Sequence, residues 1–207
     1  MIARPSRVEP VILEGDHVRL EPMSMDHLPG LAAVGLEPAI WTWMPVRVRA
    51  ADDMRALVVA ALADRDAGTA FPFVTVERAG GRVVGSSRYL AIALEHARLE
   101  IGWTWISPAW QRSAVNTEAK LLMLEHAFER LGCRRVEFKT DAQNAASRRA
   151  LLGVGATFEG VFRKHMLVRG GERRDSAWYS ITDDEWPDVR ALLRARLARR
   201  RASEGPA

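Results

Sequence analysis

Hydrophobic side chains recur along the chain with two different periods, and the period indicates which segments are helices and which are strands. Over residues 54–62 the interval is three or four residues, which predicts an amphipathic helix that ends at Gly68. A second apolar helix is predicted over residues 117–131, followed by Gly132. Because its apolar side chains cover a wide arc, we expect this helix to pack against a sheet and one further element.

Shorter segments have the alternating or continuous apolar pattern that is typical of strands. They cover residues 18–20, 71–76, 82–90, 99–106, 136–140, 158–168 and 174–181. Glycine-containing turns at residues 79–81 and 169–172 predict two hairpins. Further helices are predicted over residues 24–34 and 147–152 and from Pro187 onward, whereas residues 36–50 are expected to form a loop.

The order of these elements predicts how the strands pair. The strand over residues 99–106, the helix over residues 117–131 and the strand over residues 136–140 follow one another, and this order predicts a parallel crossover. The earlier strands are joined by short turns and are expected to pair antiparallel. No linker divides the chain. The pattern therefore predicts a single α/β domain (α+β mixed sheet), in which helices flank a mixed, mostly antiparallel sheet.

The composition is that of an ordinary soluble domain, with 207 residues of which 48% are hydrophobic. A single cysteine, Cys133, forms no intramolecular disulfide, and no His, Cys or acidic cluster has the spacing of a metal site, so no metal is predicted. The first residues lack the apolar stretch of a signal peptide, and no run approaches the ~20 apolar residues of a membrane span. We therefore expect a cytoplasmic protein with no membrane partner.

Basic residues outnumber acidic ones only slightly, 30 to 26, for a formal net charge of +4. The excess lies near the C-terminus, where arginines end a predicted helix and complement the negative end of its dipole. Charges of both signs are interleaved elsewhere, and the sequence has no helix-turn-helix or aromatic–basic platform. A nucleic-acid partner is therefore not predicted.

The turn before the helix over residues 117–131 suggests the chemistry of the site. A helix N-terminus leaves backbone N–H groups without intrahelical partners and carries a partial positive charge, so it attracts phosphate groups. We predict a phosphate or pyrophosphate site there, with an ordinary capped loop as the alternative. The candidate residues are Gln111, Arg112, Ser113, Ala114, Val115, Asn116 and Thr117.

Together with this turn, five short segments in a fixed order resemble the GNAT acyl-CoA N-acyltransferases, and among them the RimJ/RimL-like branch. They are residues 17–22 (HVRLEP), 100–103 (EIGW), 116–120 (NTEAK), 159–163 (EGVFR) and 179–181 (YSI). The resemblance extends over residues 12–195, which leaves residues 1–11 as an N-terminal extension and residues 196–207 as an Arg-rich tail. It implies a single GNAT-like domain in which the central strands splay apart.

The resemblance implies acyl transfer, with acetyl-CoA as the expected co-substrate and a primary amine as the acceptor, by direct attack in a ternary complex. The amine would belong to a small molecule or to a protein N-terminus, and homodimers are common among relatives. Transfer of a larger or acidic acyl group such as succinyl is the competing enzymatic interpretation. A CoA-binding module without turnover is the non-enzymatic one.

The resemblance also assigns the residues that would hold the co-substrate. Backbone groups of Ile106 and Ser107 would pair with the pantetheine arm as an added strand, and Asn144 and Ser147 follow the next strand. At the pyrophosphate turn, Ala114 and Asn116 stand where the family usually has small glycines, which is a departure from its pattern.

Acyl transfer needs a base for the incoming amine and an acid for the departing thiolate. Glu100, on the strand that leads into the turn, is the first candidate base, and a structural ion pair with an arginine is its alternative role. His165 is the second, because an unperturbed histidine titrates near neutral pH. Many relatives place a tyrosine as the acid where this chain has Leu151. Ser147 is therefore the candidate acid, although a serine there could equally cap the short helix.

The acceptor pocket is expected in the loop over residues 36–50. Trp41, Trp43 and Met44 are the candidate substrate-binding residues, because aromatic side chains on a loop can stack on a ligand. The alternative is that the tryptophans anchor this loop to the core.

Overall fold

One mixed sheet of eight strands organises the protein, and the strand order is β1-β2-β3-β4-β5-β6-β8-β7. The computed structural model describes residues 8–204. The strands are β1 (Leu13–Glu14), β2 (Val18–Pro22), β3 (Ala70–Glu77), β4 (Val83–Ala93), β5 (Arg98–Ile106), β6 (Arg135–Asp141), β7 (Thr157–Val168) and β8 (Glu172–Thr182). Neighbouring strands pair antiparallel except β5 and β6, which are parallel. The predicted mixed sheet with one parallel crossover is confirmed.

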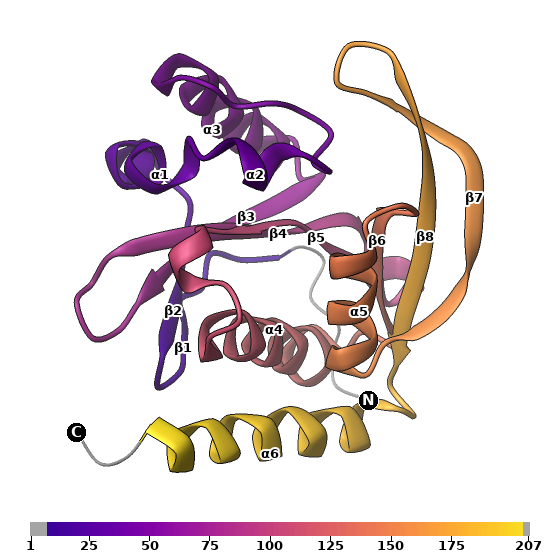
Figure 1. The fold of residues 1–207 in the computed structure, drawn as a ribbon. Helices are drawn as coiled ribbons and strands as arrows, with labels where there is room; N and C mark the ends of the chain where they lie inside the picture. The colour runs from indigo at the N-terminus through magenta and orange to yellow at the C-terminus, as the bar shows by residue number, and fades with distance from the viewer. Residues whose placement is uncertain (1–7, 205–207) are drawn as a thin grey trace.

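Helices cover both faces of this sheet, with α1, α2 and α3 on one side and α4, α5 and α6 on the other (Figure 1). Their bounds are α1 (Leu28–Gly35), α2 (Pro38–Trp41), α3 (Ala51–Asp66), α4 (Ala114–Glu125), α5 (Ala145–Val154) and α6 (Trp186–Glu204). A π-helical turn over His126–Arg130 extends α4, and Gly132 then bends the chain with a positive φ of 65°. Within residues 8–204, no helix combines the length and the apolar content needed to cross a membrane.

Two sequence predictions about helices were wrong. Residues 36–50 contain the short helix α2, which begins at Pro38, a residue whose fixed φ suits the first helical position. Helix α4 begins at Ala114 rather than at Thr117, because Ser113 is the N-cap and its Oγ accepts a hydrogen bond from the Val115 N–H at 3.2 Å. Both Ser113 and Asn116 are residues that commonly cap helices, and the pattern alone did not distinguish them.

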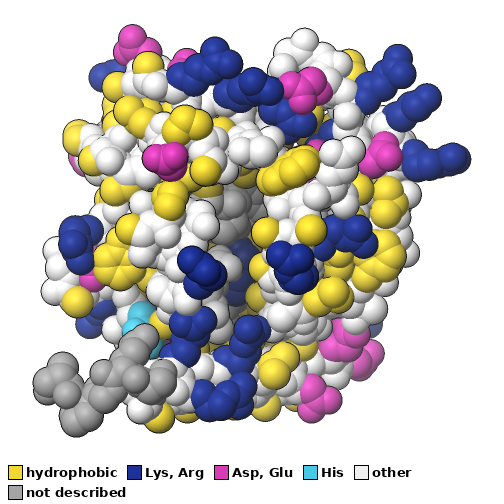
Figure 2. Space-filling view, in the orientation of Figure 1, with side chains coloured by type: hydrophobic (Ala, Val, Ile, Leu, Met, Phe, Trp, Pro, Cys, Tyr) yellow, Lys and Arg dark blue, Asp and Glu magenta, His cyan; other side chains and the backbone are white. Residues whose placement is uncertain are grey.

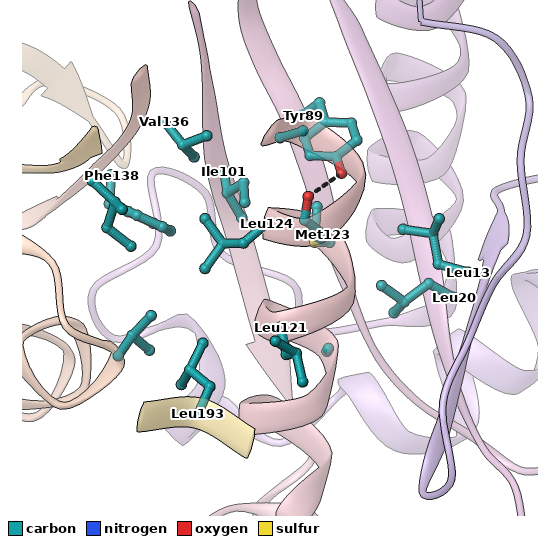
Figure 3. Close-up of a cluster of buried hydrophobic side chains, with 14 of the residues drawn as sticks. Leu13, Leu20, Tyr89, Ile101, Leu121, Met123, Leu124, Val136, Phe138 and Leu193 are labelled. Atoms are coloured by element: carbon teal, nitrogen blue, oxygen red, sulfur yellow. Dashed lines mark hydrogen bonds between the residues drawn. The ribbon is translucent and has the colours of Figure 1, made fainter. Parts of the chain in front are cut away.

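The main core lies between the sheet and α4. The strand residues Leu20 and Ile101 lie in one buried cluster with Met123 and Leu124 from the helix, all of them at most 2% exposed (Figure 3). Burying one such side chain contributes roughly 1.5–3 kcal/mol. Tyr89 lies in the same core, and its hydroxyl donates to the Met123 carbonyl at 2.6 Å. The wide apolar arc of α4 thus packs on the sheet, and α6 covers its far side.

A buried carboxylate fixes α4 to the first strands. Glu118 accepts hydrogen bonds from the backbone N–H groups of Asp16, His17 and Val18 at 3.0, 2.6 and 2.7 Å. A Cβ atom at Gly15 would lie only 2.4 Å from the Glu118 carboxyl carbon, so a larger residue at this turn would displace the carboxylate. Glu118, from the 116–120 segment, therefore has a structural role in placing the N-terminus of α4.

The parallel strands β5 and β6 separate soon after they meet. They pair only at residues 98–100 with residues 135–137, so the remainder of the β5 edge facing β6 has no strand partner. A bulge then changes the pairing of β5 with β4 around Trp103, which has a φ of 50°. Arg88 lies over the Trp103 ring at 4.5 Å from its centroid. This separation opens the centre of the sheet and positions the candidate site.

Helix α6 extends past the end of the domain that the sequence predicted. α6 runs without interruption from Trp186 to Glu204, across the expected boundary at residue 196. At the other end, residues 1–7 of the expected N-terminal extension lie outside the described residues. The bounds 12–195 stay a prediction.

Candidate active site

A cavity of about 740 Å³ occupies the gap between β5 and β6. Its walls come from β5, β6, α4 and α5, together with the segment after α2 and the β7–β8 hairpin. Figure 2 shows a hollow down the middle of this face, with Lys and Arg side chains gathered around its lower part. The cavity therefore brings together segments that lie between Ala39 and Arg174 in the sequence.

The N-terminus of α4 forms one end of the cavity. Gln111, Arg112 and Asn116 line the wall there, and the Ser113 hydroxyl donates to the Trp110 carbonyl at 2.6 Å while its oxygen caps the helix. The positive φ of the turn falls on Arg112, at 62°. Ala114 lies inside the helix without a positive φ, as does Asn116. The departures from glycine therefore cause no backbone strain, and the first-turn N–H groups keep the orientation that suits a phosphate.

Positive charge surrounds this turn. The Arg200 guanidinium on α6 donates to the Arg112 carbonyl at 2.8 Å, which places a second arginine beside the first helical turn. Such a placement adds cationic side chains to the partial positive charge of the helix end. Asn116 has a buried Oδ1 without a hydrogen-bond partner in the described chain and lines the cavity wall, so it offers a polar contact to a ligand there.

The backbone at the end of β5 is partly occupied. The Ser107 N–H donates to the Val84 carbonyl at 2.8 Å, and the Ser107 carbonyl accepts from the Trp110 N–H at 2.8 Å. The Ile106 carbonyl accepts from the Gln111 side chain at 3.1 Å. The Ser107 N–H therefore pairs with β4, so it is not free to donate to a pantetheine arm as was expected from the sequence. The edge of β5 without a strand partner lies earlier, over residues 101–105.

Glu100 lies at the point where β5 and β6 diverge, and only 2% of it is exposed. It lines the cavity and forms an ion pair with Lys139, whose Nζ lies 2.9 Å from Oε2. Burial raises the pKa of the Glu100 carboxyl above its ordinary value, although the Lys139 ammonium opposes this effect. A carboxylate with a raised pKa is a stronger proton acceptor than an ordinary one. The expected partner was an arginine, whereas the structure supplies a lysine.

Ser147 faces the cavity from the first turn of α5. The N-cap of this helix is Asn144, whose Oδ1 accepts from the Ser147 backbone N–H at 3.0 Å. Capping by the Ser147 side chain, the alternative considered from the sequence, is thereby ruled out. Leu151, one turn further along the same wall, is buried and apolar.

His165 lies outside the cavity wall. Its Nδ1 is 3.0 Å from the Ser176 Oγ, and its ring contacts Phe162 and Trp178 edge-on. Burial, and then the positive charge of Lys139, hold the pKa of His165 below its ordinary value. The structure therefore does not bring His165 together with Glu100 and Ser147 at the cavity.

The segment after α2 contributes to the cavity only in part. Trp43 and Met44 line it, whereas Trp41 is 2% exposed, packs against Trp105 at 5.6 Å and donates through Nε1 to the Gly35 carbonyl. Trp41 therefore has the anchoring role that was the alternative to ligand binding.

Comparison with known proteins agrees with this geometry. The family model described as acetyltransferase (GNAT) domain matches residues 17–157, which is more than half of the chain. The chain belongs to the GNAT acetyltransferase family. Acetyl transfer from acetyl-CoA is the general reaction of GNAT proteins. The family predicted from the sequence is confirmed.

Individual GNAT relatives support the same placement. A GCN5-related N-acetyltransferase from Brucella melitensis is 33% identical, with a TM-score of 0.86 over 94% of this chain and 88% of that chain. Mycobacterium smegmatis RimJ, solved in complex with CoA-disulfide, is 24% identical with a TM-score of 0.72 over 86% and 88% of the two chains, and shows the fold alone.

Among curated sequences, the uncharacterized N-acetyltransferase YnaD of Bacillus subtilis is 31% identical over 87 residues, which is 42% of this chain and 50% of YnaD. The match to the curated relatives thus spans about half of their length.

Two cavity residues were missed by the sequence reasoning. Lys120 is 5% exposed, and its Nζ donates to the hydroxyls of Thr104 and Ser87 at 2.7 and 3.3 Å. Burial lowers the pKa of its ammonium to about 7. Its spacing of four residues from Asn116 puts both on one helix face, which was the available sequence signal. Arg174 on β8 is also buried at the wall, and no pattern in the sequence marked it.

Within residues 8–204, no group of three or more His, Cys, Asp and Glu side chains could hold a metal ion.

Proposed function

We propose that the protein transfers an acetyl group from acetyl-CoA to a primary amine by direct attack in a ternary complex. The observation that carries the proposal is the continuous cavity between the diverging strands β5 and β6. It has a helix N-terminus and arginines at one end and a buried carboxylate further along its wall. The two ends suit a pyrophosphate and an amine, respectively.

The co-substrate would lie along the cavity with its pyrophosphate on the first turn of α4. The donors are the N–H groups of that turn, supported by Arg112 and Arg200. The pantetheine arm would add to the free edge of β5 over residues 101–105, since β6 no longer pairs with that edge. A backbone N–H of this edge would also stabilise the oxyanion of the tetrahedral intermediate, an interaction typically worth ~3–4 kcal/mol.

Two side chains would handle the protons. The amine nitrogen attacks the thioester carbonyl, the carbon–sulfur bond breaks, and the proton lost by the amine goes to Glu100 directly or through a water molecule. Ser147, in the first turn of α5 at the cavity wall, would donate to the departing thiolate. The raised pKa of Glu100 supports its assignment as base, because its carboxylate holds a proton more readily than an exposed one does.

Loss of turnover, the non-enzymatic alternative, was suggested by the replaced glycines of the turn. Ala114 and Asn116 lie in ordinary helix, and Ser113 supplies the cap, so the replaced positions leave the helix N-terminus intact. This geometry supports the enzymatic alternative. The homodimer expected from the family resemblance stays a prediction, and light scattering tests it.

Release of CoA thiol from acetyl-CoA across a panel of amines and peptides, with mass spectrometry of the products, tests the proposed reaction. We expect one acetyl adduct per thiol released. Tight binding of acetyl-CoA without thiol release for any amine would contradict it.

The role of Glu100 is tested with Glu100→Gln, and Glu95→Gln is the matched control on an exposed turn, where 72% of the side chain is accessible. The acidic limb of the kcat/KM profile should disappear in Glu100→Gln, because protonation of this carboxylate is what abolishes activity at low pH. An unchanged profile would show that Glu100 is not the base.

Ser147→Ala tests the second proton position. We expect kcat to fall by about 10²-fold, in the range typical of general acid catalysis. Full retention of kcat would remove Ser147 from the mechanism.

A further inference from the structure

Arg174 is a buried cation that forms no ion pair of 4.0 Å or less with any described residue. It is 5% exposed, lines the cavity, and its Nε has no hydrogen-bond partner in the described part of the chain. Burying a charged group is unfavourable unless an opposite charge or hydrogen bonds compensate it. A guanidinium kept in this condition at the wall of a cavity indicates that its partner is a ligand.

The carboxylates around Arg174 already have other cations. Glu100 pairs with Lys139 at 2.9 Å, and the carboxylate of Asp141 lies 4.0 Å from the Arg169 guanidinium. Arg169 in turn pairs with Glu172 at 2.8 Å. Among the described residues, no carboxylate lies within 4.0 Å of Arg174. The three carboxylates thus equal the three cations in number. Asp141 and then Glu100 attract the Arg174 charge only from beyond 4.0 Å, and neither accepts a hydrogen bond from it, so the guanidinium donors stay open to a ligand.

Two hydrogen bonds of Arg169 connect distant segments of the chain beside this part of the cavity. The Arg169 N–H donates to the Pro45 carbonyl at 2.8 Å, and its Nη1 donates to the Met44 carbonyl at 3.0 Å. These bonds join the tip of the β7–β8 hairpin to the segment after α2, as Figure 1 shows from the approach of the two segments. Met44 and Pro45 from the segment after α2 line the cavity, and so does Met166 from β7. A cavity bounded by these connected segments favours a small-molecule acceptor over a folded protein.

We infer that Arg174 binds a carboxylate of the acceptor, so that the acceptor is a small amine that also bears a carboxylate, such as an amino acid. This inference rests on the proposed function. The planar guanidinium has paired donors whose spacing matches the two oxygens of a carboxylate, which gives direction as well as attraction. Glu100 and Arg174 line the same cavity, so an amine could face the carboxylate base while the acceptor's own carboxylate faces the arginine.

Three acceptors with the same side chain test this assignment: leucine, leucinamide and isoamylamine, each with acetyl-CoA. The wild-type protein should prefer leucine by about 10- to 100-fold in kcat/KM, the range expected for hydrogen bonds to a charged group. In Arg174→Met the preference should fall close to one, and Arg174→Lys should restore part of it. Arg173→Met is the matched control, because Arg173 is the exposed neighbour on the same strand. An equal preference in Arg174→Met and in the wild type would overturn the inference.

The same carboxylate could instead arrive on the acyl group. Succinyl-CoA with isoamylamine distinguishes this source: we expect no preference for succinyl-CoA over acetyl-CoA. A preference of tenfold or more for succinyl-CoA that is lost in Arg174→Met would overturn the assignment to the acceptor.

Two further measurements separate this inference from the proposed function and from a structural role. If none of the amines consumes acetyl-CoA, the proposed reaction fails, and calorimetry with N-acetylleucine then tests Arg174 without turnover. Binding at least tenfold weaker in Arg174→Met than in Arg173→Met upholds the carboxylate site, and equal binding overturns it.

The Tm of Arg174→Met should equal or exceed that of the wild type, because a buried charge without a close ion pair among the described residues is removed. A marked fall in Tm together with an unchanged acceptor preference would show that Arg174 is structural.

Discussion

The buried ammonium of Lys120 predicts a pH-dependent defect in stability that one substitution should remove. Lowering the pKa of this group from 10.5 to about 7 by burial means that the folded state holds the proton less well than the unfolded chain. At ~1.4 kcal/mol per pKa unit, the cost of keeping the charged form folded is roughly 5 kcal/mol as an upper value. Relaxation around the charge reduces this figure, and we expect Lys120→Met to gain about 2–4 kcal/mol at pH 6.

The sign of the pH dependence follows from proton counting. Between pH 7 and pH 10.5 the unfolded state binds more protons at this site than the folded state does, so the wild-type protein becomes more stable as pH rises. Below pH 7 both states are protonated and the full cost is present. The advantage of Lys120→Met should therefore be largest at pH 6, shrink by up to ~1.4 kcal/mol per pH unit above pH 7, and vanish near pH 10.

The substitution leaves few polar groups unsatisfied. Ser87 and Thr104, which accept from Lys120, also lie 2.7 Å from each other through their hydroxyl oxygens and can remain paired. Urea unfolding followed by tryptophan fluorescence at pH 6, 7.5 and 9 measures the effect. Lys164→Met, at an exposed lysine, is the control and should show no pH-dependent difference. A constant offset between Lys120→Met and the wild type across this range would refute the reasoning, because it would leave no role for a buried charge.

Three further predictions concern residues that hold the site in place. Glu118→Ala removes three hydrogen bonds to a buried carboxylate and should cost about 4 kcal/mol of unfolding free energy; a loss below 1 kcal/mol in urea unfolding would show that water replaces the carboxylate. Ser113→Ala removes the α4 cap and should cost about 1 kcal/mol while raising the KM for acetyl-CoA at constant kcat, and steady-state kinetics with an unchanged KM would place the phosphates elsewhere. Trp41→Ala should lower stability by about 3–5 kcal/mol, seen as a fall in Tm, whereas a change confined to the acceptor KM would make Trp41 a ligand residue after all.

The local sequence pattern was sufficient to predict most of the helices and strands. The turn containing Gly81 and the helix end at Gly132 both have the positive φ values that glycine permits, and they fall where the sequence predicted a hairpin and a helix end. The anion-binding turn was also visible, since small and capping residues between a strand and a helix indicate a helix N-terminus. The first residue of α4 could not be predicted in the same way, because Ser113 and Asn116 are equally good caps by residue type.

Tertiary structure decided the identities of the charged groups at the cavity. Hydrophobic periodicity states which face of an element is buried, but it does not state the register between strands that lie far apart in sequence. The pairing of Glu100 with Lys139 depends on the short parallel contact between β5 and β6. That the Arg174 Nε has no hydrogen-bond partner among the described residues depends on how the β7–β8 hairpin lies against these strands. The sequence by itself thus determined the family, the elements and the turn. Only the packed sheet decided which charges are buried, because the free energy of a charge depends on neighbours that local pattern does not specify.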